Sequence, residues 1–263
     1  MSISTDIKKK INSISKIPHH NGYVNCWKEN LLSGLDVKAV ESDLKSGSGQ
    51  ELDKKFRAIY SSSALCVNNF GILKDAKLCS NFELLGQTGF APVVFEKKLP
   101  TGLKGTPPNL DAYFENDKCI ICIESKYTEH FKKKKAKFKP KYEDNKDKIL
   151  SYLPESFWKV KERYMNYYGY LDIAQLLKHT IGLINNRNGK QPHLLYIYWQ
   201  PENQDSIDVC NEHQKELEEF QEQMKTLTEI SFHAMSYSEF WMKYENDKNI
   251  GEHIKIVIKR YKI

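Results

Sequence analysis

Residues 107–126 read PPNLDAYFENDKCIICIESK, in which the apolar runs LDAYF and CIICI are joined by the polar residues ENDK. Apolar runs of β-branched and aromatic residues around Asn, Asp and charged residues are typical of a β-hairpin. Side chains alternate along a strand, so Glu124 and Lys126 share one face, and pairing of the two runs brings Asp111 near Glu124. The sequence therefore predicts two carboxylates and one ammonium group converging at a strand end.

This combination of side chains suits metal-assisted hydrolysis of a phosphodiester. Paired carboxylates are the ligands that a hard cation such as Mg²⁺ prefers. A Lys beside them can orient the attacking water or offset charge on a phosphate. The alternative for Asp111, Glu124 and Lys126 is an exposed ion pair at a strand end, because such pairs are common and nearly neutral in energy. Most of the other acid-x-Lys triplets of the chain, such as Asp53-x-Lys55, lie in polar or helical surroundings and lack the strand context.

The segments PNLDAYF and CIESK resemble the active-site signature of the PD-(D/E)xK nuclease superfamily, which has the restriction-endonuclease-like fold. The Pro that often precedes the Asp is displaced here to Pro107 and Pro108. Four segments are similar, more narrowly, to a group of bacterial proteins classed as restriction endonucleases: SSSALCVNNFGIL (61–73), FEKKLP (95–100), CIESKYTEHF (122–131) and YLDIAQLLKHTIGL (170–183). The likeness extends over roughly residues 55–200.

The resemblance implies a divalent-metal-dependent DNA endonuclease of the restriction type, which leaves a 5′-phosphate and serves in host defence. Asp111, Glu124 and the backbone carbonyl of Ser125 would bind Mg²⁺, for which Mn²⁺ can substitute. Lys126 would orient or help to deprotonate the attacking water. Two alternatives remain open: a non-catalytic nucleic-acid-binding protein on the same fold, and a repair or RNA-directed nuclease.

The resemblance also implies two further polar residues in the site. An additional acid comes from Glu96 or Glu83, with Glu96 ranked first; for each the alternative is an ordinary exposed Glu. Gln175 is expected on an amphipathic helix over residues 171–186, where a surface amide is the alternative. His179 lies one turn further on the same face and is interpreted as a packing histidine.

A basic block leaves the predicted site directly. Residues 126–148 hold 10 Lys against 4 acidic residues, although the net charge of the whole chain is only +6. A phosphate backbone would be attracted to such a block with salt-dependent affinity, whereas the alternative is a solvated loop. Double-stranded DNA is the expected partner, and a homodimer would suit cleavage of a palindrome. The candidate DNA-binding residues are Lys104, Lys132, Lys133, Lys134, Lys135 and Lys137.

Length and composition favour a globular α/β protein of 263 residues. We expect an N-terminal helical extension over residues 1–50 and a nuclease domain over 51–263. No run of 18 apolar residues and no apolar signal core is present, which predicts no membrane span and a bacterial cytoplasmic location. Cys119-x-x-Cys122 would face opposite sides of a strand, so all six cysteines are interpreted as buried small hydrophobes, without a zinc site.

The predicted fold is an α/β restriction-endonuclease-like core, with a central mixed β-sheet flanked by helices. The PHLLYIYW run (192–199) is apolar on both faces, as in a buried strand of a mixed or parallel sheet. The tail at 253–262 alternates apolar and basic residues, which suggests a terminal strand or the edge of a helix. The remaining elements are expected as helices at 51–74, 76–88, 204–228 and 237–245, and strands at 91–98 and 229–236.

Overall fold

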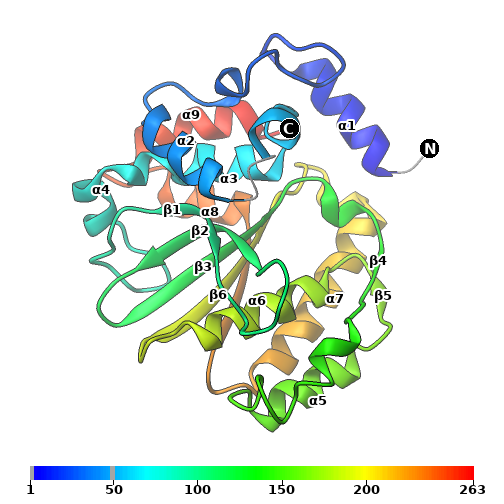
Figure 1. Cartoon of the computed structure of the whole chain (residues 1–263). Helices are drawn as coiled ribbons and strands as arrows, with labels where there is room; N and C mark the ends of the chain where they lie inside the picture. The colour runs from blue at the N-terminus through cyan, green and yellow to red at the C-terminus, as the bar shows by residue number, and fades with distance from the viewer. Residues whose placement is uncertain (1–2, 48–50) are drawn as a thin grey trace.

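The computed structural model describes residues 3–47 and 51–263, and its centre is a five-stranded mixed sheet (Figure 1). The strand order is β1-β2-β3-β6-β7. The first three strands are antiparallel, whereas β6 runs parallel to β3 and β7 runs parallel to β6. The bounds are β1 Val94–Lys98, β2 Asn109–Glu115, β3 Cys119–Lys126, β6 Gln191–Tyr198 and β7 Ser231–Ser236.

Helices cover both faces of this sheet (Figure 1). Their bounds are α1 Ile3–Ile14, α2 Val37–Ser46, α3 Ser62–Phe70, α4 Ala76–Asn81, α5 Glu155–Arg163, α6 Ile173–Asn185, α7 Asp208–Met224, α8 Tyr237–Tyr244 and α9 Gly251–Tyr261. A second small sheet pairs β4 Lys134–Lys135 with β5 Tyr168–Gly169. The predicted fold class is therefore confirmed: an α/β core with a central mixed sheet flanked by helices.

Strand β3 lies at the middle of the sheet and is buried along its whole length. Its side chains alternate between two apolar cores. Ile121 and Ile123 join the core formed with α3, α8 and α9, and Ile120 and Cys122 join the core formed with α5, α6 and α7. A strand with neighbours on both edges and helices on both faces has no solvated side, which explains its continuous apolar run.

The N-terminal helices belong to the first of these cores. Ile7 of α1 and Leu44 of α2 are buried within it. Asp43 of α2 also accepts a hydrogen bond from the backbone N–H of Phe95 at 2.8 Å. The expected division at residue 50 stays a prediction. None of the described helices is long and apolar enough to cross a membrane.

Several predicted elements differ in the structure. The predicted 51–74 helix is interrupted, because Ser61 caps a new helix by accepting from the N–H of Ala64. The predicted 76–88 helix ends at Asn81, because the backbone is already extended at Phe82 and turns at Leu85, which has a positive φ. The tail is the helix α9, so of the two alternatives for residues 253–262 the helix is confirmed and the terminal strand is wrong.

Two predictions concerned the cysteines. Cys119 and Cys122 are buried in opposite cores, as expected from their spacing on a strand. The expectation that all six are buried is wrong for Cys26, which is exposed, whereas the other five are buried and free.

Candidate active site

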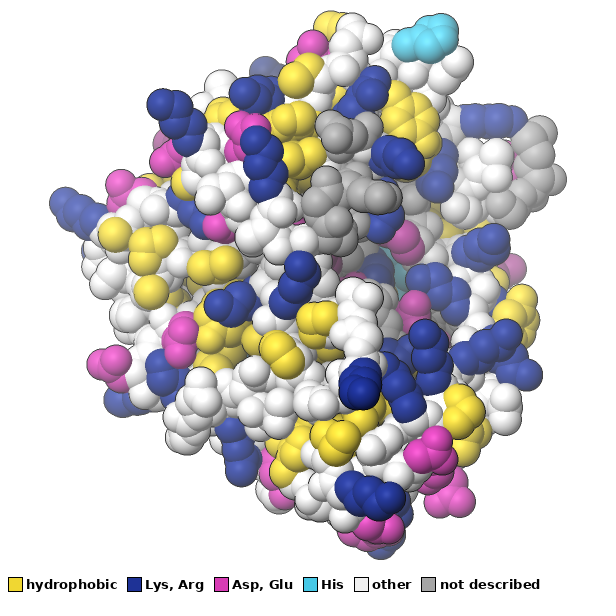
Figure 2. Space-filling view, viewed as in Figure 1, with side chains coloured by type: hydrophobic (Ala, Val, Ile, Leu, Met, Phe, Trp, Pro, Cys, Tyr) yellow, Lys and Arg dark blue, Asp and Glu magenta, His cyan; other side chains and the backbone are white. Residues whose placement is uncertain are grey.

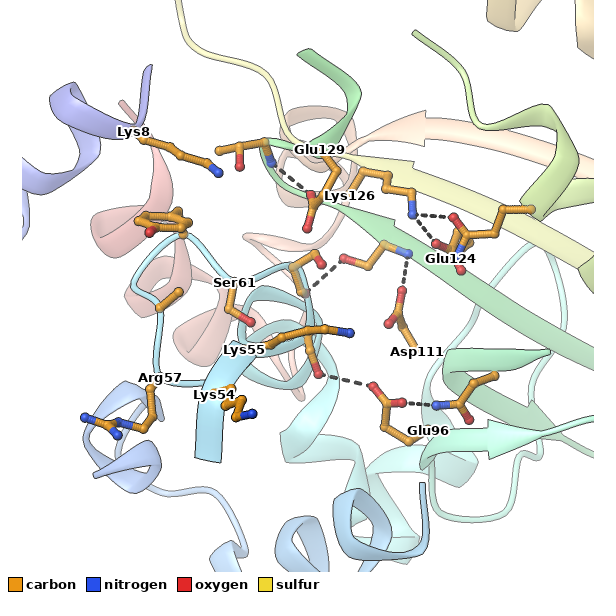
Figure 3. Close-up of a pocket in the computed structure, with 18 of the residues that line it drawn as sticks. Lys8, Lys54, Lys55, Arg57, Ser61, Glu96, Asp111, Glu124, Lys126 and Glu129 are labelled. Atoms are coloured by element: carbon orange, nitrogen blue, oxygen red, sulfur yellow. Dashed lines mark hydrogen bonds and ion pairs between the residues drawn. The ribbon is translucent and has the colours of Figure 1, made fainter. Parts of the chain in front are cut away.

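The candidate site lies at the end of the β2–β3 ladder, where the two strands separate. Their antiparallel ladder ends with Ala112 opposite Ile123. Beyond that pair the carboxylate of Asp111 turns into the gap, and its Oδ2 accepts the backbone N–H of Ser125 at 2.7 Å (Figure 3). This bond replaces a missing ladder bond and fixes the Asp111 carboxylate beside the end of β3.

Glu124 and Lys126 lie on one face of β3, as the strand periodicity predicts. They form a direct ion pair, with Glu124 only 2% and Lys126 only 8% exposed. The Nζ of Lys126 also donates to Oε1 of Gln175 on α6 at 2.8 Å. Lys126 is therefore held between its own strand and the helix that covers it, unlike the exposed ion pair that was the alternative.

His179 was interpreted from the sequence as a packing histidine, but it contacts the site. Its Nε2 lies 2.8 Å from Oε2 of Glu124, and the residue is 2% exposed. Gln175 and His179 are one turn apart on α6, so one helix face reaches both Lys126 and Glu124. The four-residue spacing was visible in the sequence, but the crossing of α6 over β3 was not.

Glu96 is the better of the two candidates for an additional acid. The β1–β2 register pairs Phe95 with Ala112, which places Glu96 opposite Asp111. The backbone of Glu96 has φ 53°, in the left-handed region, and this distorts the strand beside the site. Its carboxylate accepts from the side chains of Asn109 and Ser63.

Glu83 lies elsewhere on the molecule. It follows the end of α4, and its carboxylate pairs with Lys243 at 3.2 Å on an exposed surface. Its expected place on a helix beside the hairpin is therefore wrong, because α4 stops two residues before it.

Three carboxylates and one buried ammonium group share the site. Burial, Glu124 and Glu96 raise the pKa of Asp111 well above its ordinary value, and Lys126 only partly opposes them. Burial would also raise the pKa of Glu124, but Lys126 and His179 outweigh it and lower that pKa to about 2. Ionised Asp111 is thus repelled by the carboxylates of Glu124 and Glu96, and Lys126 offsets only part of this repulsion.

The pKa of Lys126 is shifted in the opposite sense to that of a simple buried amine. Burial lowers the pKa of a Lys, but Glu124, Glu129 and Asp111 together raise it above the ordinary value. Lys126 is therefore an ammonium group at neutral pH and a hydrogen-bond donor.

All of these groups open into one cavity of about 840 Å³. Figure 2 shows a hollow on this face, with Lys and Arg side chains around it. Its far wall comes from the N-terminal part of the chain, and Lys8 and Lys55 extend into the cavity, whereas Arg57 points away (Figure 3). Lys8 lies 4.6 Å from the ring centroid of Tyr60, also on this wall.

Apart from Lys126 itself, the predicted basic block contributes only Lys134 to the described residues that line this cavity, and Lys134 pairs with Asp172 at 2.9 Å. Lys133 instead pairs with Glu212 at 2.9 Å. The other candidates are exposed side chains away from the cavity: Lys104, Lys132, Lys135 and Lys137. No motif in the sequence indicated the wall residues Lys8 and Lys54, because they lie far from the signature segments.

The donor set fits a hydrated magnesium ion. Within residues 3–47 and 51–263, no three Asp, Glu, His or Cys side chains are close enough to hold an ion among themselves. Mg²⁺ does not require such a cage, since it is commonly bound by one or two carboxylates and keeps several waters. Asp111 and Glu124 supply two carboxylates beside a cavity large enough for water, and a cation there would stabilise the ionised form of Asp111, which burial and the neighbouring carboxylates oppose.

Comparison with known proteins gives one family. The model of the family described as "Restriction Endonuclease associating with ARP" matches residues 3–262. No curated protein and no solved structure matches the chain significantly. The family match includes the N-terminal helices that line the cavity as well as the strands that carry the carboxylates.

Proposed function

The chain belongs to the family of restriction endonucleases associating with ARP, and from this premise we propose that it is a divalent-metal-dependent DNA endonuclease. Membership indicates a nuclease that acts in defence. The observation that carries the proposal further is the convergence of Asp111, Glu124 and Lys126 at one end of a cavity. The PD-(D/E)xK signature of this sequence motivates the same assignment.

Each residue of this group has a distinct part in the proposed reaction. Asp111 and Glu124 would bind Mg²⁺ together with the backbone carbonyl of Ser125. When bound, Mg²⁺ would act as a Lewis acid that offsets charge on the scissile phosphate; Mn²⁺ would substitute for it. Asp111 is already aligned by the N–H of Ser125, so little reorganisation of that carboxylate is needed.

Lys126 would position the attacking water and stabilise negative charge on the phosphate. Because its pKa is raised, it remains protonated at neutral pH and acts as a hydrogen-bond donor, not as a general base. Gln175 would limit where the ammonium group points, since its Oε1 accepts from Lys126. Glu96 would add negative charge on the opposite side of Asp111.

The cavity walls support a phosphodiester substrate. Three lysines line the wall that faces the carboxylates, Lys8, Lys54 and Lys55, and Arg57 belongs to the same wall with its guanidinium directed away. Phosphate oxygens would be attracted to this wall while the scissile group lies near the acidic end. We propose double-stranded DNA as the substrate, with the basic block of residues 126–148 as a further contact surface. Cutting both strands of a palindrome would be served by a homodimer.

Plasmid cleavage by wild type and Lys126→Ala, each with Mg²⁺ and with EDTA, tests the proposal. We expect Mg²⁺-dependent cutting by wild type and a loss of roughly 10²-fold or more in the variant, as for removal of one electrostatic contact to a reacting group. Lys248→Ala is the matched control, because this exposed Lys lies outside both the cavity lining and the basic block.

The form of the products separates the outcomes. Discrete fragments would identify a sequence-specific endonuclease, and a smear would identify a non-specific one. Cutting that persists in EDTA, or equally in Lys126→Ala, would contradict the proposed site. A gel shift of DNA in EDTA without cutting of any DNA in Mg²⁺ would favour a binding protein.

A further inference from the structure

Both oxygens of the Glu124 carboxylate have a partner from a different element. Oε1 receives the ammonium group of Lys126, which is on the same strand. Oε2 lies 2.8 Å from Nε2 of His179 on α6. A carboxylate held on both oxygens cannot rotate freely, so its direction toward the cavity is determined by these two contacts.

Helix α6 reaches the two chemical groups through two side chains on one face. Gln175, in its first turn, contacts Lys126, and His179, one turn later, contacts Glu124. The helix itself is fixed at its start, because Asp172 caps it by accepting the N–H of Gln175 at 3.2 Å. Gly182 lets it approach the neighbouring segment further along, since a Cβ at this position would lie 2.8 Å from the backbone carbonyl oxygen of Leu99.

The surroundings of His179 argue against a role in packing alone. The ring is buried, and within the described residues neither of its nitrogens makes a hydrogen bond of regular geometry, although Nε2 lies 2.8 Å from Oε2 of Glu124. Among the described residues, Glu124 is the only acidic side chain within ion-pairing distance of the His179 ring. Burying an imidazole costs free energy unless a polar partner compensates, and an aliphatic residue would fill the same space without that cost.

We propose that α6 divides the support of the site between two positioning residues: His179 orients the metal-binding carboxylate of Glu124, and Gln175 orients Lys126. This inference rests on the proposed function. It assigns the two residues different consequences. Loss of His179 would weaken metal binding, whereas loss of Gln175 would leave metal binding intact and slow cleavage. Residues that orient a metal ligand commonly contribute about 10- to 100-fold to metal affinity.

Titration of the full-length protein with Mn²⁺ alone, followed by calorimetry or by paramagnetic resonance, tests this division without any DNA. We expect His179→Ala to bind Mn²⁺ about 10- to 100-fold more weakly than wild type. His179→Gln should recover part of the affinity, because its amide nitrogen can occupy a place close to that of Nε2. Lys178→Ala, on the same helix but outside the cavity lining, is the control and should bind as wild type does.

Gln175→Ala completes the experiment. We expect it to bind Mn²⁺ as wild type does and to cut plasmid more slowly at saturating Mn²⁺. Unchanged Mn²⁺ affinity in a folded His179→Ala would overturn the inference, as would equal loss of Mn²⁺ affinity in Gln175→Ala. If His179→Ala does not fold, His179→Gln and His179→Leu are measured instead. A Mn²⁺ affinity of His179→Gln that lies between those of wild type and Glu124→Gln would support the role of His179. A Mn²⁺ affinity of His179→Leu equal to that of wild type would overturn it.

Failure of the proposed function gives a different pattern. Wild type that neither binds Mn²⁺ nor cuts DNA would overturn the metal-dependent nuclease itself. Wild type that binds Mn²⁺ and cuts, with His179 variants that bind equally well, would overturn only the role of His179.

Discussion

Asp111 is held in a position that is unfavourable for a carboxylate without a cation. It accepts one backbone N–H, but Glu124 and Glu96 lie close enough to raise its pKa. A functional group is often placed at such a cost in stability, because the same repulsion favours the ligand that neutralises it. The metal-free protein should therefore be less stable with Asp111 ionised than with it neutral.

Asp111→Asn tests this at the scale of one residue. We expect a higher melting temperature in EDTA at pH 8, because the amide oxygen can still accept the Ser125 N–H while the repulsion is gone. A gain of about 1 kcal/mol would correspond to roughly 2–4 °C for a chain of this size. The sign follows from linkage: a raised carboxyl pKa means that wild type loses stability as pH rises through that pKa.

The advantage of Asp111→Asn should accordingly shrink toward pH 4, where the wild-type carboxyl is protonated in the folded state. Saturating Mg²⁺ should reverse the order by stabilising wild type more than the variant. Thermal melts at several pH values, with EDTA and with Mg²⁺, measure both effects. A variant that is less stable than wild type in EDTA at pH 8 would show that the repulsion is unimportant.

At this scale the sequence predicts contacts along the hairpin and misses those between distant segments. The alternation of side chains was sufficient to bring Asp111, Glu124 and Lys126 together, because a short turn fixes the register of two strands. The contact of His179 with Glu124 depends on where α6 crosses β3. No local rule in the sequence determines that crossing, so the residue was interpreted as packing.

The position of helix α6 depends on Gly182, a residue of its buried side that has no side chain. A Cβ at Gly182 would lie 2.8 Å from the carbonyl oxygen of Leu99 and 2.9 Å from Pro108. Both obstacles belong to the segment that leads into β2. The helix can therefore carry Gln175 and His179 over the site only if residue 182 stays small.

Gly182→Ala should consequently destabilise the protein although Ala favours helices. The gain in helix propensity is at most about 1 kcal/mol, whereas overpacking of a core contact costs about 1–3 kcal/mol. We expect a lower melting temperature and slower plasmid cleavage, since displacement of α6 would move both positioning residues. Lys178→Ala, a partly exposed position of the same helix, is the control. Unaltered cleavage in Gly182→Ala would mean that the site tolerates a shifted helix.

Helices and strands were predicted accurately where the sequence carries a long apolar run or a clear apolar periodicity. The strands β2, β3 and β6 carry long apolar runs, and all three were placed within a few residues. The segment before α3 was predicted as helix because its apolar spacing fits one. In the structure a short π-helix at Glu51–Lys55 ends before turns at residues 56–60, where Ala58 forms a bridge with Tyr23, and Ser61 then caps α3.

The two walls of the cavity come from different parts of the molecule. The carboxylates belong to the sheet, whereas Lys8 and Lys54 come from segments that precede it by 40 residues or more in the sequence. The predicted DNA-binding residues of the basic block lie largely outside the cavity. DNA that reaches the carboxylates should therefore contact the N-terminal wall.

Binding measurements across a range of salt concentrations test this in EDTA, where no cutting occurs. The double variant Lys8→Ala with Lys54→Ala should weaken binding and reduce the slope of log affinity against log salt by about 2, since each lost phosphate contact contributes about 0.9. Lys132→Ala with Lys137→Ala removes the same charge from exposed positions outside the cavity. An equal or larger fall in slope for this second pair would assign the main contact surface to the basic block instead.

The origin of the two cavity walls has a consequence for how members of this family can diversify. Strand β3 at the centre of the sheet tolerates little substitution, because each side chain of β3 is buried and packs in a core or contacts another group. With the proposed function, the N-terminal wall would meet the substrate from outside this framework, and its side chains are more exposed than those of β3. Substitutions there could change which DNA is bound while the hydrolytic groups remain as they are. Exchange of the wall residues between relatives is thus a practical way to engineer new target preferences on one unchanged reaction centre.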